Sequence, residues 1–186
     1  MIYIFLVLLD YPRITGADQK VAQLVARPGQ IRVTNLILYV VFGVALVVLA
    51  AALQDRMKVA SPGLMAVGGA LGLIWAGSLV AAGIAPAVAL FATDPAEATL
   101  TWAATEAVAS GLGNGNGEIL GGLMTALVSL AGLCGGTLPR LVTLPGLLIG
   151  AVGIVTLAPV LADMTGLFGT AQGLWFVGLV VVLLRA

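Results

Sequence analysis

Between Thr34 and Leu53 the chain has twenty consecutive residues without a charge, and most of them are aliphatic. A helix that crosses the hydrocarbon layer, about 30 Å thick, needs roughly 20 such residues at about 1.5 Å per residue. Further apolar runs follow at about 63–92, 118–134, 141–161 and 169–184. Only helices satisfy their own backbone hydrogen bonds within one segment in lipid. The sequence therefore predicts an all-α, polytopic transmembrane helical bundle with about five full spans.

The composition supports lipid as the surroundings of these runs. Hydrophobic residues make up 61% of the chain and charged residues 9%, whereas soluble domains carry about 25% charged residues. No soluble domain fits anywhere, so residues 1–186 are expected to form a single integral membrane domain, in the bacterial cytoplasmic (inner) membrane. Eight basic and eight acidic residues cancel, and no basic patch predicts a nucleic-acid partner.

The N-terminal residues Met1–Leu9 form a short hydrophobic segment with nine residues before Asp10, enough for about half a span. We expect this segment to be the end of a longer natural helix, with a half-inserted stub as the alternative. Within residues 10–33, apolar side chains at helical spacing favour a short interfacial helix that ends at Pro28-Gly29. Further along, Pro86 is expected to kink the long run at 63–92.

A surface helix is predicted near 95–110. Asp94 can cap free amides, Pro95 suits the first helical position, and Glu97 stands where a capping box places a carboxylate. Threonines and Glu106 make this segment too polar to cross lipid, so we expect it to lie on, or dip into, the membrane surface. The glycine-rich residues 111–117 then act as a flexible break, since they lack the spacing of a nucleotide-binding loop.

This threading gathers carboxylates and side-chain amides at one leaflet, which we expect to be the outer one, and it places Tyr39 and Gln172 in or just under the same leaflet. Ionisable groups at membrane depth are costly and indicate function by default. Glu118 is the most suggestive, although a carboxylate at a helix N-terminus is also stabilised by the free amides and the helix dipole. Hard oxygen ligands suit Ca²⁺, Mg²⁺ or Na⁺, but no ordered ligand spacing predicts a metal site. The candidate polar ligand cluster comprises Asn35, Glu106, Asn114, Asn116, Glu118 and Asp163.

Small residues recur four apart within the predicted spans. Such pairs let neighbouring helix backbones approach closely, and packing within the chain is favoured over a dedicated dimer interface. The pairs are Gly68/Gly72, Gly117/Gly121, Gly146/Gly150 and Gly169/Gly173. The loops at 54–61 and 135–140 are expected on one side of the membrane, and Trp102 and Trp175 are expected to anchor the opposite interface.

Catalysis is not expected. Histidine is absent, which removes the usual ligand of zinc and haem and the usual base of a serine hydrolase, and no cofactor is predicted. The leading hypothesis is a non-enzymatic structural or accessory subunit of a larger membrane complex. Its partners would be the lipid bilayer and either other membrane subunits or further copies of the chain. The alternative is a binding or transport module for an ion, lipid or small amphiphile, which would use the outer-leaflet polar cluster.

Several hydrophobic motifs resemble a family of small bacterial polytopic membrane proteins that is catalogued only as a domain of unknown function. The similar stretches are 35–43, 72–77, 111–118, 168–177 and 183–185, so the resemblance covers nearly the whole chain. It implies a six-helix membrane protein whose first helix is complete, and the short N-terminal segment of this chain departs from that pattern. The family brings no activity, so no functional residue is transferred from it.

Overall fold

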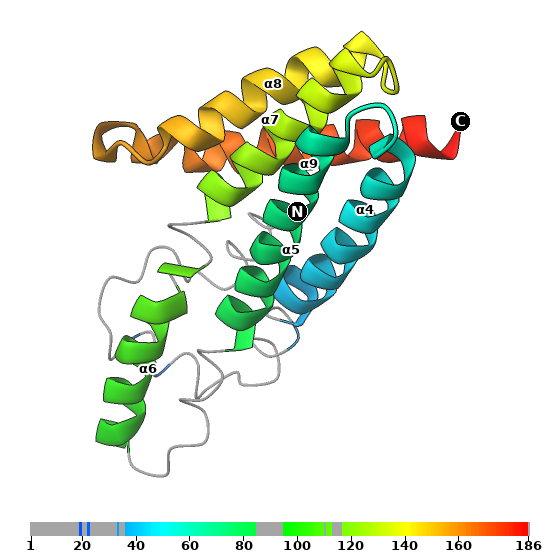
Figure 1. Cartoon of the computed structure of the whole chain (residues 1–186). Coiled ribbons are helices and arrows are strands. Elements are labelled where there is room, and N and C mark those ends of the chain that lie inside the picture. The colour runs from blue at the N-terminus through cyan, green and yellow to red at the C-terminus, as the bar shows by residue number, and fades with distance from the viewer. Residues whose placement is uncertain are drawn as a thin grey trace. The chain divides into compact units, whose positions relative to one another are not determined.

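The computed structural model describes residues 36–84, 95–109, 111–112 and 117–185, and in addition the single residues Gln19, Ala22 and Val33. Every regular element in this part of the chain is helical, which confirms the all-α prediction (Figure 1). In chain order the elements are η2 (Leu36–Val41, a π-helical turn), α4 (Phe42–Met57), α5 (Pro62–Ile84), α6 (Pro95–Ala109), α7 (Gly117–Cys134), α8 (Arg140–Val155), η5 (Pro159–Met164, a 3-10 helix) and α9 (Thr165–Leu184).

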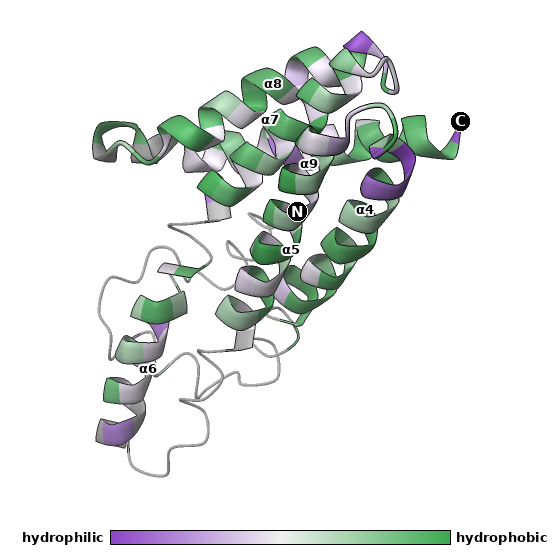
Figure 2. Cartoon of the chain, in the orientation of Figure 1, coloured by the Kyte–Doolittle hydropathy of each residue, from purple (hydrophilic) through white to green (hydrophobic). Residues whose placement is uncertain are grey.

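Three helical stretches of the described residues are long and apolar enough to cross a membrane: Leu36–Met57, Pro62–Gly83 and Thr165–Leu184. Figure 2 shows that hydrophobic residues dominate most of their length. The chain is therefore a membrane protein. Two of the five expected spans correspond to shorter apolar helices, Glu118–Cys134 and Arg140–Val155. The N-terminal segment 1–9, the expected interfacial helix within 10–33 and Pro86 lie outside the described residues.

Three helix boundaries differ from the sequence prediction by four residues or more. The span expected to stop at Leu53 continues to Met57. The span expected at 141–161 ends at Val155, and the hydroxyl of Thr156 there donates a hydrogen bond of 2.7 Å to the carbonyl of Gly153. Pro159 then starts a separate 3-10 helix, because proline has no N–H with which to continue the α-helical ladder. The last helix begins at Thr165 instead of 169. The predicted helices at 95–110 and 118–134 match α6 and α7 closely.

The described chain divides into two compact units. One consists of residues 1–44 and 78–113, and the other of residues 45–77 and 114–186. In the first unit, the ring of Tyr39 lies directly on Gly83, where a side chain larger than hydrogen would overlap with it. The second unit contains the α7–α8–α9 assembly and the α4–α5 turn, and its helices carry most of the described interhelical contacts.

Helices α7 and α8 form an antiparallel hairpin whose backbones approach each other through glycine. A methyl group on Gly122 would lie 2.8 Å from the carbonyl oxygen of Gly150, and one on Gly153 would lie 2.7 Å from that of Glu118. The turn between the helices contains Gly136 at φ 63°, a left-handed conformation that glycine adopts without steric cost. Close backbone packing of this kind is how membrane helices associate where water does not drive them together.

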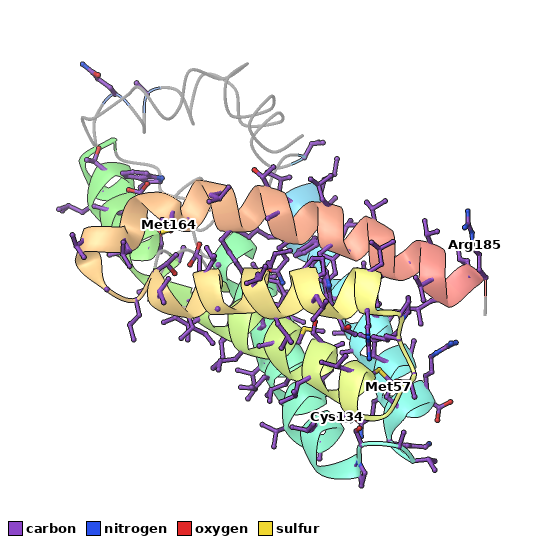
Figure 3. The ribbon with its side chains drawn as sticks, turned by 90° about the horizontal axis from the view of Figure 1, so that it is seen from above. Met57, Cys134, Met164 and Arg185 are labelled. Carbon is purple, nitrogen blue, oxygen red and sulfur yellow. The ribbon has the colours of Figure 1, made fainter. Side chains whose placement is uncertain are left out.

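The α4–α5 turn lies beside the α7–α8 turn, as the threading predicts. The Ser61 hydroxyl donates a hydrogen bond of 3.0 Å to the carbonyl oxygen of Ala131. Figure 3 shows Met57, at the end of α4, close to Cys134, at the end of α7, and places Met164 and Arg185 at opposite ends of the last helix. The two loops at 54–61 and 135–140 therefore share one end of this unit.

Candidate functional site

The structure describes only part of the predicted polar cluster. Asn35, Asn114 and Asn116 lie outside the described residues, and for Asp163 the backbone in η5 is described but the side chain is not. Glu106 and Glu118 are both half-buried, and each belongs to a different unit, so no common geometry is defined for them. The cluster as a whole remains a prediction from the sequence.

Glu118 occupies the first turn of α7. The free N–H groups at this helix start favour a negative charge, and the two residues that follow, Ile119 and Leu120, are half-buried and apolar. Its backbone carbonyl faces Gly153 of α8 at the closest part of the hairpin. The backbone of Glu118 is therefore held by helix packing at the end of the α7–α8 pair.

Glu106 lies in the fourth turn of α6, one residue after Thr105. The Thr105 hydroxyl donates to the carbonyl oxygens of Thr101 at 2.8 Å and Trp102 at 3.1 Å, so this threonine satisfies its polar group within its own helix. Trp102 is almost completely buried. The prediction that Trp102 lies exposed as an interfacial anchor is therefore wrong for this structure, because the indole is covered by protein.

A group of buried polar side chains lies between the described helices α7, α8 and α9, and of its residues the sequence analysis named only Gln172. We call it the polar seam: Thr125 and Ser129 of α7, Thr143 of α8 and Gln172 of α9. Each of these side chains is buried, three of them completely. Ser and Thr recur four apart along α7, and Gln172 is the only amide side chain in α9, so the signal was a polar stripe within apolar helices.

One hydrogen bond joins two members of the seam, Gln172 and Thr125, whereas the buried hydroxyls of Ser129 and Thr143 have no hydrogen-bond partner among the described residues. The Gln172 amide nitrogen donates to the Thr125 hydroxyl at 2.7 Å and, more weakly, towards the carbonyl oxygen of Gly121 at 3.4 Å. One turn further along α9, the indole nitrogen of Trp175 donates to the carbonyl oxygen of Val142 in α8 at 2.9 Å. Hydrogen bonds from α9 thus reach both α7 and α8 and fix the register of the three helices.

Trp175 is also buried, at 5% exposure, and this corrects its predicted role as an anchor at the membrane interface. Its indole nitrogen lies directly on Gly146, beside the hydroxyl of Ser129. The space for the ring exists only because residue 146 has no side chain. The predicted Gly146/Gly150 pair therefore packs within the chain, as expected.

Two of the other glycine pairs differ in their surroundings: one packs against a neighbouring helix and the other does not. Gly68 and Gly72 face α7, where methyl groups on them would lie 3.3 Å from Leu127 and 3.1 Å from Met124 respectively. In contrast, Gly169 and Gly173 of α9 have no atom within 4 Å of an added methyl group. The prediction that this last pair packs against a neighbouring helix is wrong within the described chain, because α9 turns its Phe168, Gln172 and Trp175 side towards α7 and α8.

The seam connects neighbouring helices through polar side chains that carry no charge. None of its side chains titrates near neutral pH, since all are hydroxyls or an amide. Among the described residues, no group of three or more His, Cys, Asp and Glu side chains is placed to hold a metal ion. Interhelical hydrogen bonds of this type contribute on average about 0.6 kcal/mol each in membrane proteins. The seam therefore adds specificity of register more than overall stability.

Comparison with protein-family models, with curated proteins and with solved structures finds no match for this chain.

Proposed function

We propose that the chain is a non-enzymatic, multi-pass protein of the bacterial inner membrane that acts as an accessory subunit of a larger membrane complex. Helix α8 would be the element that docks on the neighbouring subunit. The observation that carries this proposal is the two-sided character of α8, in which one face is locked to the rest of the chain and the other presents a ridge of large apolar side chains.

The inner face of α8 is fixed by close packing. Gly146, Gly150 and Gly153 are buried in it, together with Val142 and Thr143. Because glycine packing and the Trp175 hydrogen bond define the position of this helix, little conformational freedom is left for it to lose on association. A surface that is already ordered binds a partner at lower entropic cost.

The outer face of α8 carries Leu141, Leu144 and Leu148, with exposures of 85%, 51% and 72%. This spacing places the three leucines on one side of the helix. At 16 residues α8 is about 24 Å long, shorter than the hydrocarbon layer of about 30 Å. In the proposed five-span arrangement, a helix this short lowers its mismatch with lipid by lying against another protein.

Site-specific photocross-linking tests this docking face. A photoreactive phenylalanine analogue at position 148, in cells that express the native level of the protein, is expected to give a discrete adduct with one other membrane protein. The matched control is position 174 on α9, where the native leucine is 70% exposed, as against 72% at position 148. Position 174 should give lipid adducts only.

Two results would contradict the accessory role. One is equal cross-linking from positions 148 and 174, which would mean that α8 faces lipid as α9 does. The other is a chain that always runs as a free monomer after extraction in a mild detergent. A cross-link to a second copy of the chain would instead identify a homo-oligomer as the complex.

A second candidate function is a binding or transport module for an ion, lipid or small amphiphile. Glu118 favours it, because this carboxylate is half-buried where α7 begins. If it binds a cation, Glu118→Gln should lower ion or substrate flux in proteoliposomes about tenfold or more, since charge-assisted contacts are lost. Glu97→Gln, on the exposed first turn of α6, is the control. Unchanged flux in the Glu118 variant would rule this candidate out.

A further inference from the structure

A groove of about 490 Å³ runs between α4 and α5 in the second unit. Its walls are almost entirely apolar and consist mainly of small residues, which are Ala50 and Ala51 on α4 and Ala66 and Ala70 on α5. Leu73 also lines the groove. This volume falls within the range of about 300–1,000 Å³ typical of sites for small molecules. The apolar side chains that line this groove suit an unbranched hydrocarbon chain.

The groove contains one buried polar atom that lacks a partner. The Gln54 side chain lies across the groove onto Gly69, where a methyl group would be 2.9 Å from the Gln54 Oε1 atom. Oε1 is inaccessible to solvent and has no hydrogen-bond partner within the described part of the chain. A buried acceptor without a donor is costly, so the geometry favours an occupant that brings a donor to this oxygen.

The mouth of the groove carries both signs of charge. Asp55 and Lys58 are exposed, line the groove and form an ion pair with each other across one helical turn. They lie at the end of the apolar stretch Leu36–Met57, which is long enough to cross a membrane. The ends of such helices lie at the level of the lipid headgroups. Figure 2 shows this polar end of α4 in contrast to the hydrophobic length of the helix.

From this arrangement we propose that the groove binds one phospholipid with a primary ammonium headgroup, of the phosphatidylethanolamine type. One acyl chain lies along the alanines of α4 and α5. When the lipid binds, the half-buried Gln54 side chain turns towards the mouth of the groove. The ammonium group then donates to Gln54 Oε1 and to the Asp55 carboxylate, and the phosphate accepts from Lys58. A zwitterionic headgroup thereby matches the paired charges at the mouth, and its N–H donors satisfy the buried acceptor.

The headgroup chemistry gives a direct test on the full-length chain. The purified protein is titrated in detergent with lipids of identical acyl chains, and bound lipid is counted by native mass spectrometry. Phosphatidylethanolamine is expected to bind about tenfold more tightly than phosphatidylcholine, whose trimethylated ammonium has no N–H to donate. Phosphatidylglycerol, which has no ammonium for Asp55, is expected to bind more weakly than phosphatidylethanolamine.

Variants assign the preference to this groove. Gln54→Met keeps the shape of the side chain and removes the acceptor, and it should reduce the preference for phosphatidylethanolamine over phosphatidylcholine severalfold. Ala70→Phe should fill the groove and abolish binding of both lipids. The control is Val67→Phe, on an exposed position of α5 that does not line the groove, and it should bind as the native protein does.

The proposal fails if the native protein binds all three lipids equally, or if Gln54→Met leaves the preference intact. It also fails if Ala70→Phe leaves lipid binding unchanged and converts a dimer to a monomer, because a helix of a second copy would then occupy the groove. Should Ala70→Phe not fold, the headgroup series on the native protein and on Gln54→Met still decides the matter. None of these results depends on whether α8 docks on a partner subunit.

Discussion

Replacing Trp175 by alanine is expected to destabilise the α7–α8–α9 assembly by about 3–5 kcal/mol, the range seen when a large aromatic side chain is removed from a packed core. The indole is buried between α8 and α9, lies on Gly146 and donates its N–H to Val142. Its removal leaves a cavity and takes away the hydrogen bond that joins α9 to the Val142 carbonyl of α8. Reversible unfolding of the purified protein in mixed micelles with rising SDS would measure the change.

Two further variants separate the loss of the hydrogen bond from the loss of buried side-chain volume. Trp175→Phe retains most of the aromatic volume but removes the hydrogen bond, so it should cost less than Trp175→Ala. Leu174→Ala, one residue earlier, removes a side chain that is mostly exposed and should change stability by less than about 0.5 kcal/mol. If Leu174→Ala destabilises the protein as much as Trp175→Ala does, the burial of Trp175 described above is wrong.

Gly150→Val is expected to separate α7 from α8 and to cost about 1–3 kcal/mol or more, as overpacking of a tight interface does. A Cβ atom at this position would lie 2.7 Å from both Ala126 Cβ and the carbonyl oxygen of Gly122. Because the neighbours include backbone atoms, no side-chain rotation relieves the overlap. The helices themselves must move apart. A lower midpoint of SDS-induced unfolding and a lower temperature of aggregation in detergent would report the loss.

Gly169→Val is the matched control for this experiment. It makes the same change in another apolar helix, α9, where an added methyl group meets no atom within 4 Å. Its unfolding midpoint should therefore stay close to that of the native protein. Equal losses from Gly150→Val and Gly169→Val would contradict the packing described here and would point to a general effect of valine on these helices.

The helix boundaries show what local sequence signals can predict and what they cannot. The predicted starts of α6 and α7 agree with the structure, since a capping sequence at Asp94–Glu97 and a glycine-rich break before Glu118 act within a few residues. Hydropathy alone extended the next span to residue 161, although the helix ends at Val155. Ala158 and Leu161 are as apolar as the helix interior, so a hydrophobic run does not reveal where its hydrogen-bond ladder stops.

The candidate site was harder to predict than the helices. Glu118 stood out in the sequence because charge is rare in this chain, and the structure places it half-buried at a helix start. Gln172 was placed at the same leaflet as the polar cluster but was not assigned to it, and Thr125 did not stand out, because a single hydroxyl is common in membrane helices. Their structural role depends on a hydrogen bond between the two side chains, which are 47 residues apart in sequence.

The sequence by itself determined that the chain is helical and belongs in a membrane, because long uncharged apolar runs permit no other satisfied backbone in lipid. Only the tertiary structure decided which glycines are contacts, that Trp102 and Trp175 are buried, and that Gln54 closes over Gly69. In a chain where most residues are apolar, the hydrophobic pattern does not tell which face of a helix is buried. Steric fit and hydrogen bonds between helices therefore selected the buried face of each one, and these depend on neighbours that are distant in sequence.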